Sequence, residues 1–150
     1  MKRIILAAAI VCTNAHAADT ILIDTYTKHS DECQSGIETC EPWKQPRRVS
    51  WQHDISESWS MDIGAGTNSH GTKSANIGAL WQPIGREGIK AGLWAAFVTG
   101  YTRDQLRTRF VAAGAVLTAS YRGAALQLVY APEFGRSSIS VLSLRTGHQF

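Results

Sequence analysis

The sequence predicts an all-β fold, an eight-stranded antiparallel up-and-down transmembrane β-barrel, and three observations predict it. Apolar and polar residues alternate along successive segments, which is the pattern of strands with one apolar face. The segments approach the roughly 9 to 11 residues that a tilted membrane strand needs. Short connections alternate with longer ones, as they do between the two ends of an outer-membrane barrel.

The alternation is clearest in three successive segments, residues 48–55, 59–67 and 74–81. In the last of these, Ala75 and Ile77 lie on one face, while polar residues or glycine lie on the other. Five further segments complete the even count, namely residues 20–29, 88–101, 109–121, 125–132 and 138–150. Short turns are expected at 56–58, 83–87 and 122–124, and longer loops at 30–47 and 102–109.

The aromatic residues support a position in a bilayer. The chain ends on Phe150 in an alternating strand, which is typical of proteins handed to the outer-membrane assembly machinery. Amphipathic rings near strand ends favour the membrane interface, and such rings occur at Trp51, Trp59, Trp81, Tyr101 and Tyr130. The alternative is a soluble periplasmic barrel or sandwich, which also alternates.

The first 17 residues have the pattern of a secretory signal peptide. Lys2 and Arg3 precede a short apolar run that ends in an A-x-A sequence, so cleavage is expected after Ala17. A lipoprotein signal with Cys12 is the weaker interpretation, because bulky Val11 precedes that cysteine. Residues 18–150 are then expected to form one barrel domain in the bacterial outer membrane.

Two cysteines, Cys33 and Cys40, remain in the mature chain. An even pair in an exported protein favours a disulfide, here closing a short loop. Two free thiols are the alternative.

Charge and motifs argue against several classes of function. The formal net charge is only +3, and the basic residues are scattered, whereas nucleic-acid binding needs a concentrated basic surface. The sequence lacks the cysteine and histidine spacings of zinc sites and a glycine-rich phosphate loop between a strand and a helix. No metal and no other cofactor is therefore expected.

The interior of the predicted barrel has room for an apolar ligand. The segments AGLWAAFV (91–98) and FVAAGAVLTA (110–119) are apolar on both faces, and eight strands enclose a lumen only wide enough for side chains or one slender ligand. Small residues are expected to leave space for a hydrocarbon chain at Gly64, Gly66, Gly78, Gly92, Ala96, Ala113 and Ala115. Pro132 either interrupts strand pairing, which would admit a lipid tail sideways, or simply ends its strand.

A candidate reactive site follows from the up-and-down threading. The first and third expected strands, residues 20–29 and 59–67, both run from the periplasmic end to the external end. His29 therefore reaches the external end, together with Asn68, Ser69 and His70. A hydroxyl and an imidazole at one rim are the minimum for acyl transfer in which histidine removes the hydroxyl proton.

Four segments together resemble one family, the outer-membrane lipid A palmitoyltransferases (PagP). They are TYTKH (25–29), TNSHGTKSANIGALWQPI (67–84), YTRDQ (101–105) and the C-terminal residues 121–150. The resemblance implies a monomeric barrel that takes an acyl chain from a phospholipid donor and transfers it to lipid A at the external rim. It implies a functional histidine at His29 and places the family's Asp-Ser pair at Asn68 and Ser69.

The chain departs from the family pattern in three ways. Asn68 cannot carry the negative charge of the family's aspartate, and no amphipathic helix precedes the first strand. The family's pocket-floor glycine falls at Leu80, close to Gly78, and a leucine there predicts an acyl chain shorter than palmitate. Arg103 in the basic loop is expected to hold lipid A phosphates, unless the loop is merely solvated.

Two other functions fit a small barrel. A lipid A deacylase also combines a serine with a histidine, but its His-x-Ser pattern is missing from this sequence. A non-catalytic barrel for adhesion or membrane integrity explains Asn68 directly.

Overall fold

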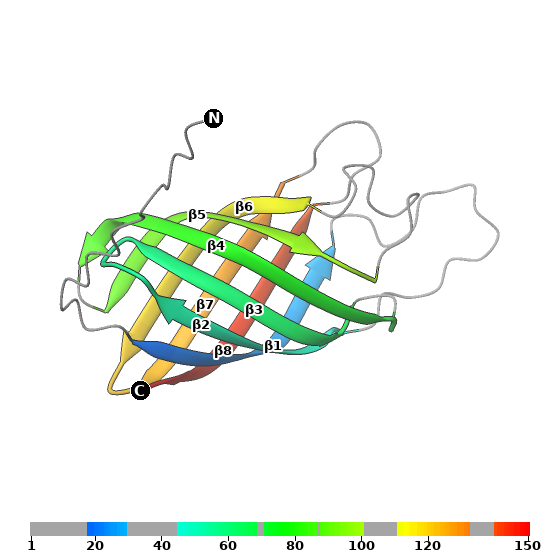
Figure 1. The fold of residues 1–150 in the computed structure, drawn as a ribbon, viewed down its shortest axis with the longest axis horizontal. Coiled ribbons are helices and arrows are strands. Elements are labelled where there is room, and N and C mark those ends of the chain that lie inside the picture. Colours follow the sequence, from blue (N-terminus) through cyan, green and yellow to red (C-terminus); the bar gives the residue numbers. More distant parts are fainter. Residues whose placement is uncertain (1–17, 30–44, 69–70, 87, 101–110, 133–139) are drawn as a thin grey trace, which may run out of the picture.

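A computed structural model describes residues 18–29, 45–68, 71–86, 88–100, 111–132 and 140–150 of the chain. Eight antiparallel strands form a closed barrel in sequence order, and β8 pairs with β1 to complete it (Figure 1). The strands are β1 (Asp19–His29), β2 (Arg47–Asp54), β3 (Trp59–Thr67), β4 (Lys73–Arg86), β5 (Ile89–Val98), β6 (Val111–Tyr121), β7 (Ala124–Ala131) and β8 (Val141–Gln149). The predicted fold class is confirmed.

Seven of the predicted strands match the observed ones closely, and β4 is longer than predicted. Residues 83–87 were expected to form a turn, but Ile84, Gly85 and Arg86 continue the ladder with β5. The register shifts between Trp81 and Ile84. This irregularity accommodates Pro83, which has no N–H to donate to the ladder.

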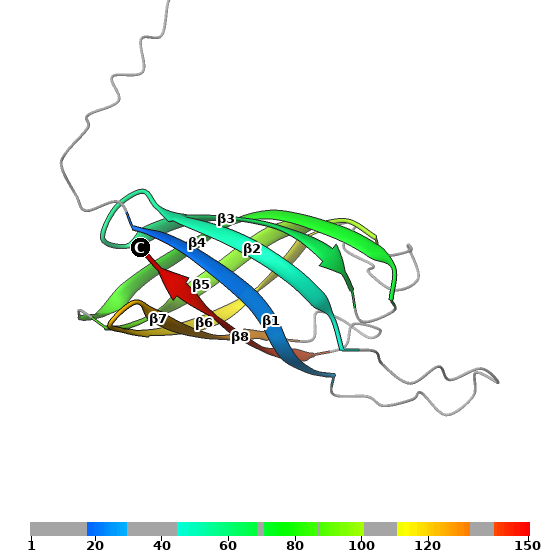
Figure 2. The same ribbon diagram turned by 90° about the horizontal axis from the view of Figure 1, so that it is seen from below.

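The two ends of the barrel differ in their connections. At one end, called here the turn end, the chain enters at Ala18, finishes at Phe150 and makes the three short connections between strands (Figure 2). Backbone hydrogen bonds between Asp19 and Phe150 join the first and last strands there. The four longer connections leave from the opposite end, called the loop end.

The β6–β7 turn has the geometry of a two-residue hairpin. Arg122 and Gly123 both have positive φ angles, of 49° and 84°, as a type I′ turn requires. Glycine adopts this conformation without steric cost, which accounts for the Gly123 predicted in this turn.

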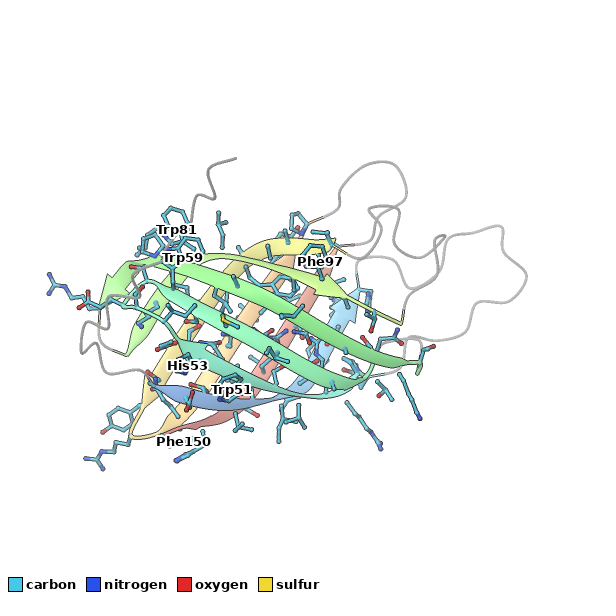
Figure 3. The ribbon with its side chains drawn as sticks, viewed as in Figure 1. Trp51, His53, Trp59, Trp81, Phe97 and Phe150 are labelled. Carbon is cyan, nitrogen blue, oxygen red and sulfur yellow. The ribbon has the colours of Figure 1, made fainter. Side chains whose placement is uncertain are left out.

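The outer surface of the barrel is apolar. Many large hydrophobic side chains are exposed around it, including Ile63, Ile77, Leu93 and Phe97. Aromatic rings lie toward both ends: Trp59 and Trp81 form a tilted pair near the turn end, and Phe97 lies near the loop end (Figure 3). A closed barrel with such a belt satisfies its backbone internally, as the hydrocarbon of a bilayer requires. The described residues include no helix that is long and apolar enough to cross a membrane.

The small residues of the strands do not leave the open slot that the sequence predicted. A Cβ atom at Gly64 would overlap Ser50 Oγ and Asn76 Oδ1 from the two neighbouring strands. At Gly66, Gly78 and Gly92 it would collide with the backbone of an adjacent strand. These glycines allow close approach between strands, so the prediction that they keep the lumen open is wrong.

The predicted direction of two alanines is also wrong. Ala112 packs against the buried cluster inside the barrel and Val116 belongs to it, so the alternating Ala113 and Ala115 face outward. Both faces of β6 are apolar, and the pattern alone did not distinguish inside from outside.

Candidate functional site

A buried ion-pair layer crosses the middle of the lumen. Arg145 on β8 places Nε 3.1 Å from Asp24 Oδ1 and Nη1 3.5 Å from Asp62 Oδ2. Arg48 Nε lies 3.0 Å from the other oxygen of Asp24. The side chains of Arg145, Asp24 and Asp62 are at most 1% exposed. Two cations and two anions thus neutralise one another, which is the condition for burying charge at acceptable cost.

Side-chain amides and a ring extend this layer across the barrel. Arg145 Nη1 donates to Gln127 Oε1 at 3.2 Å, and Gln127 Nε2 donates to Gln52 Oε1 at 2.9 Å. Asn76 Nδ2 donates to Asp62 Oδ2 at 2.7 Å. The Arg145 guanidinium also lies 5.9 Å from the centre of the Trp94 ring. Arg145 therefore contacts side chains from β1, β3, β5 and β7, and it fills the centre of the lumen.

An apolar cluster occupies the lumen beside this layer. Its six buried members are Leu80, Trp94, Ala96, Val98, Val116 and Val129, from strands β4 to β7. Along β5 the members follow one another from Trp94 to Val98 at the loop end, so the cluster extends from the ion-pair layer toward that end. The prediction of an apolar interior holds for this side only, because polar side chains fill the middle and the turn end.

The predicted histidine lies at the loop end of the lumen. His29 is the last residue of β1, pairs with Val141 of β8 and is only 8% exposed. Two residues earlier, Thr27 shares a 3.1 Å hydrogen bond with Ser143. The imidazole is thus held inside the rim.

Asn68 holds the turn between β3 and β4. Its Nδ2 donates to the carbonyl of Gly100 at 2.8 Å, and its Oδ1 accepts from the backbone N–H of Thr72 at 3.0 Å. Both functions of the amide are therefore engaged with backbone. Asn68 positions the turn that carries Ser69, and its direct participation in catalysis stays a prediction.

Several predicted site residues lie outside the described part of the chain. These are Ser69 and His70, Arg103, and the predicted disulfide partners Cys33 and Cys40. The structure places His29 and Asn68 at the same end of the barrel, His29 at the end of β1 and Asn68 directly after β3, with β2 between these two strands. Leu80 is fully buried within the apolar cluster, and Gly78 lies against Ala96.

Pro132 ends its strand, as one of the two sequence interpretations held. The β7–β8 ladder runs to the pair Ala131–Val141, directly before the proline. On the other side of β7, the ladder with β6 ends at Ala115–Tyr130, although β6 continues to Val111 toward the loop end. Gly114, the next residue of β6, lies against the backbone of Tyr130 and Ala131.

A small polar cavity lies at the turn end. Its volume is about 30 Å³, and its lining includes Thr20, Gln52, Asp54, Gln82, Lys90 and Gln127. A cavity of this size and polarity suits about one water molecule.

Sequence reasoning missed the four charged residues of the ion-pair layer. Each lies on a strand at a position whose parity faces inward, and a charge at such a position needs a partner. This was the available signal, although the sequence alone does not say which strands supply the partners. Among the described residues, no group of three or more histidine, cysteine, aspartate or glutamate side chains is arranged to hold a metal ion.

Together, the closed barrel, its apolar belt and its filled lumen define a small transmembrane β-barrel. No protein-family model matches the chain, and no curated protein matches it. A solved structure described as "De novo design of transmembrane beta-barrels" is similar with a TM-score of 0.55 and 13% identity, covering 89% of this chain and 95% of the designed one. The likeness supports the fold.

Proposed function

We propose that this protein is an acyltransferase of the bacterial outer membrane that moves a short fatty acyl chain from a phospholipid to lipid A. The observation that carries the proposal is the apolar cluster in the lumen, which extends from Leu80 and Trp94 toward the loop end. An apolar wall that begins at the rim and ends on a charged layer suits one acyl chain, since hydrocarbon gains from leaving water only where the surroundings are apolar.

The position of His29 supports the same proposal. Its imidazole is buried at the rim to which the apolar cluster leads. In the proposed reaction, His29 takes the proton from the Ser69 hydroxyl as its oxygen attacks the ester carbonyl of the phospholipid. The ester C–O bond breaks, and the lysophospholipid leaves with that proton. A lipid A hydroxyl then takes the acyl group from Ser69, losing its proton to His29, and the proton returns to Ser69.

The residues in the lumen set the length of the chain. Leu80 is fully buried, and the Trp94 ring lies beside Arg145. These two bulky members form the end of the apolar cluster next to the ion-pair layer, so a long acyl chain would have to displace them. The expected product therefore carries a chain shorter than sixteen carbons.

Mass spectrometry of lipid A tests the proposal. Cells that produce the protein are expected to gain one acyl chain on lipid A, and Ser69→Ala and His29→Ala are each expected to abolish the gain. A Ser74→Ala variant, which changes a serine bonded to the carbonyl of Thr99, serves as the matched control and should keep it. Full activity in both site variants, with barrels of normal heat-modifiable mobility, would refute the assignment.

A second function, a non-catalytic barrel that supports membrane integrity, is favoured by one observation. Arg145 fills the lumen through contacts with four strands, as a purely structural barrel would. Unchanged lipid A in producing cells, with the protein correctly inserted, would favour this function.

A further inference from the structure

The lumen has a polar wall that the proposed acyl transfer does not use. On β3 the inward positions are Ser60, Asp62, Gly64 and Gly66, from the turn end to the loop end. The ladder places Asp54, Gln52, Ser50 and Arg48 of β2 beside them in the same order. On β4, the residues beside Gly64 and Gly66 are Asn76 and Ser74. Polar or glycine residues therefore line β2 and β3 from one end of the barrel to the other.

Polar atoms with unused hydrogen-bonding capacity lie on this wall. Ser50 Oγ, Asp62 Oδ1 and Asn76 Oδ1 are buried and make no hydrogen bond to other described residues. Buried polar atoms are normally satisfied by protein or by ordered water. All three are oxygen atoms on the polar wall at or beyond the level of the ion-pair layer, so they offer acceptors to a cation that enters the wall.

The polar wall also connects with the cavity at the turn end. Gln52 and Asp54 of β2 line that cavity, and Lys90 Nζ lies there 3.8 Å from Asp54 Oδ2. Gln127 lines the same cavity and accepts the hydrogen bond from Arg145. Arg145 thus lies between the polar cavity at the turn end and the positions of the polar wall nearer the loop end, such as Gly64 and Ser50.

We infer that the polar wall is a path for small cations across the membrane and that Arg145 closes it. The guanidinium reaches from β8 to Asp62 on β3 and is buried to 1% exposure, so it blocks the lumen both by its bulk and by its positive charge. Without Arg145, the layer would keep Arg48, Asp24 and Asp62, a net charge of +1 − 2 = −1. A narrow polar path with a negative ring at its centre favours cations.

Ion flux through purified protein in lipid vesicles and planar bilayers tests the inference. In KCl, wild-type protein is expected to conduct rarely. Arg145→Ser is expected to raise K⁺ flux by on the order of a hundredfold, because it removes both the side chain that blocks the lumen and the positive charge that repels cations there. Its reversal potential in a KCl gradient should show cation preference. Val116→Ala is the matched control, since it removes bulk from the apolar side of the lumen, and it should conduct as rarely as the wild type.

A charge-balanced variant keeps the test decisive if Arg145→Ser alone fails to fold. Arg145→Ser with Asp62→Asn leaves Arg48 paired with Asp24, so it should fold, conduct and lose cation preference. An Arg145→Ser or double-variant barrel that has normal heat-modifiable mobility and no added flux would overturn the inference. Equal flux through Val116→Ala would overturn the assignment to the polar wall. Neither result depends on lipid A, so this test is separate from that of acyl transfer.

Discussion

Replacing Arg145 by alanine tests whether the ion-pair layer holds the barrel together. The change removes the partner of two carboxylates, Asp24 at 3.1 Å and Asp62 at 3.5 Å, all of them at most 1% exposed. Asp24 keeps Arg48 as a partner, whereas Asp62 keeps the hydrogen bond from the amide of Asn76. Leaving a buried charge without its partner costs about 3–5 kcal/mol, so the free energy of unfolding is expected to fall by about that amount.

The assay is equilibrium unfolding in urea in detergent micelles or lipid vesicles, followed by tryptophan fluorescence and by electrophoretic mobility. Arg86→Ala is the matched control, because Arg86 is exposed at the end of β4 and such changes usually stay within about 0.5 kcal/mol. Adding Asp62→Asn to Arg145→Ala should restore part of the loss, since the uncompensated carboxylate is gone. Equal stability of the Arg145→Ala and Arg86→Ala variants would refute the reasoning.

Three further changes probe the close contacts between strands and turns. Gly64→Ala forces a methyl group onto polar atoms of both neighbouring strands and should lower stability by about 1–3 kcal/mol, measured by the same urea titration. Asn68→Asp replaces the amide that donates to the Gly100 carbonyl, and the lost bond should cost about 1–3 kcal/mol; an unchanged melting temperature would contradict this. Gly123→Ala places a side chain at φ 84° and should cost about 1–2 kcal/mol, visible as unfolding at a lower urea concentration.

The strands were predictable because one face of each meets lipid. Alternation in segments such as 59–67 gave the bounds of β3 without change, since a residue such as Ile63 must face outward when Asp62 and Gly64 face inward. The signal failed where both faces are apolar. Ala113 and Ala115 on β6 carry no polar neighbour to fix their direction, and the prediction put them inside the barrel.

The content of the lumen was less predictable than the wall. Arg145 contacts Asp24, Asp62 and Gln127, all of which are distant from it in the sequence. Such contacts depend on barrel closure and on the stagger between strands, and local patterns carry neither. The glycines were misread for the same reason, because only the register shows that Ser50 and Asn76 flank Gly64.

The candidate site divides in a similar way. Threading alone brought His29 and Asn68 to one end of the barrel, because strand direction alternates in an up-and-down fold. The bond from Asn68 to Gly100 was not predictable, since it joins the β3–β4 and β5–β6 connections, whose separation depends on the tertiary fold. The direct meeting of His29 with Ser69 stays a prediction.

The mass of lipid A from cells producing either the wild-type protein or Leu80→Gly tests the central claim most directly. Leu80 is fully buried in the apolar cluster, and its removal would make room for a longer acyl chain beside the ion-pair layer. The account predicts that wild type adds one chain shorter than sixteen carbons and that Leu80→Gly, in a barrel of normal mobility, adds a longer one. Lipid A without any added chain, or a sixteen-carbon chain added by the wild type, would contradict it.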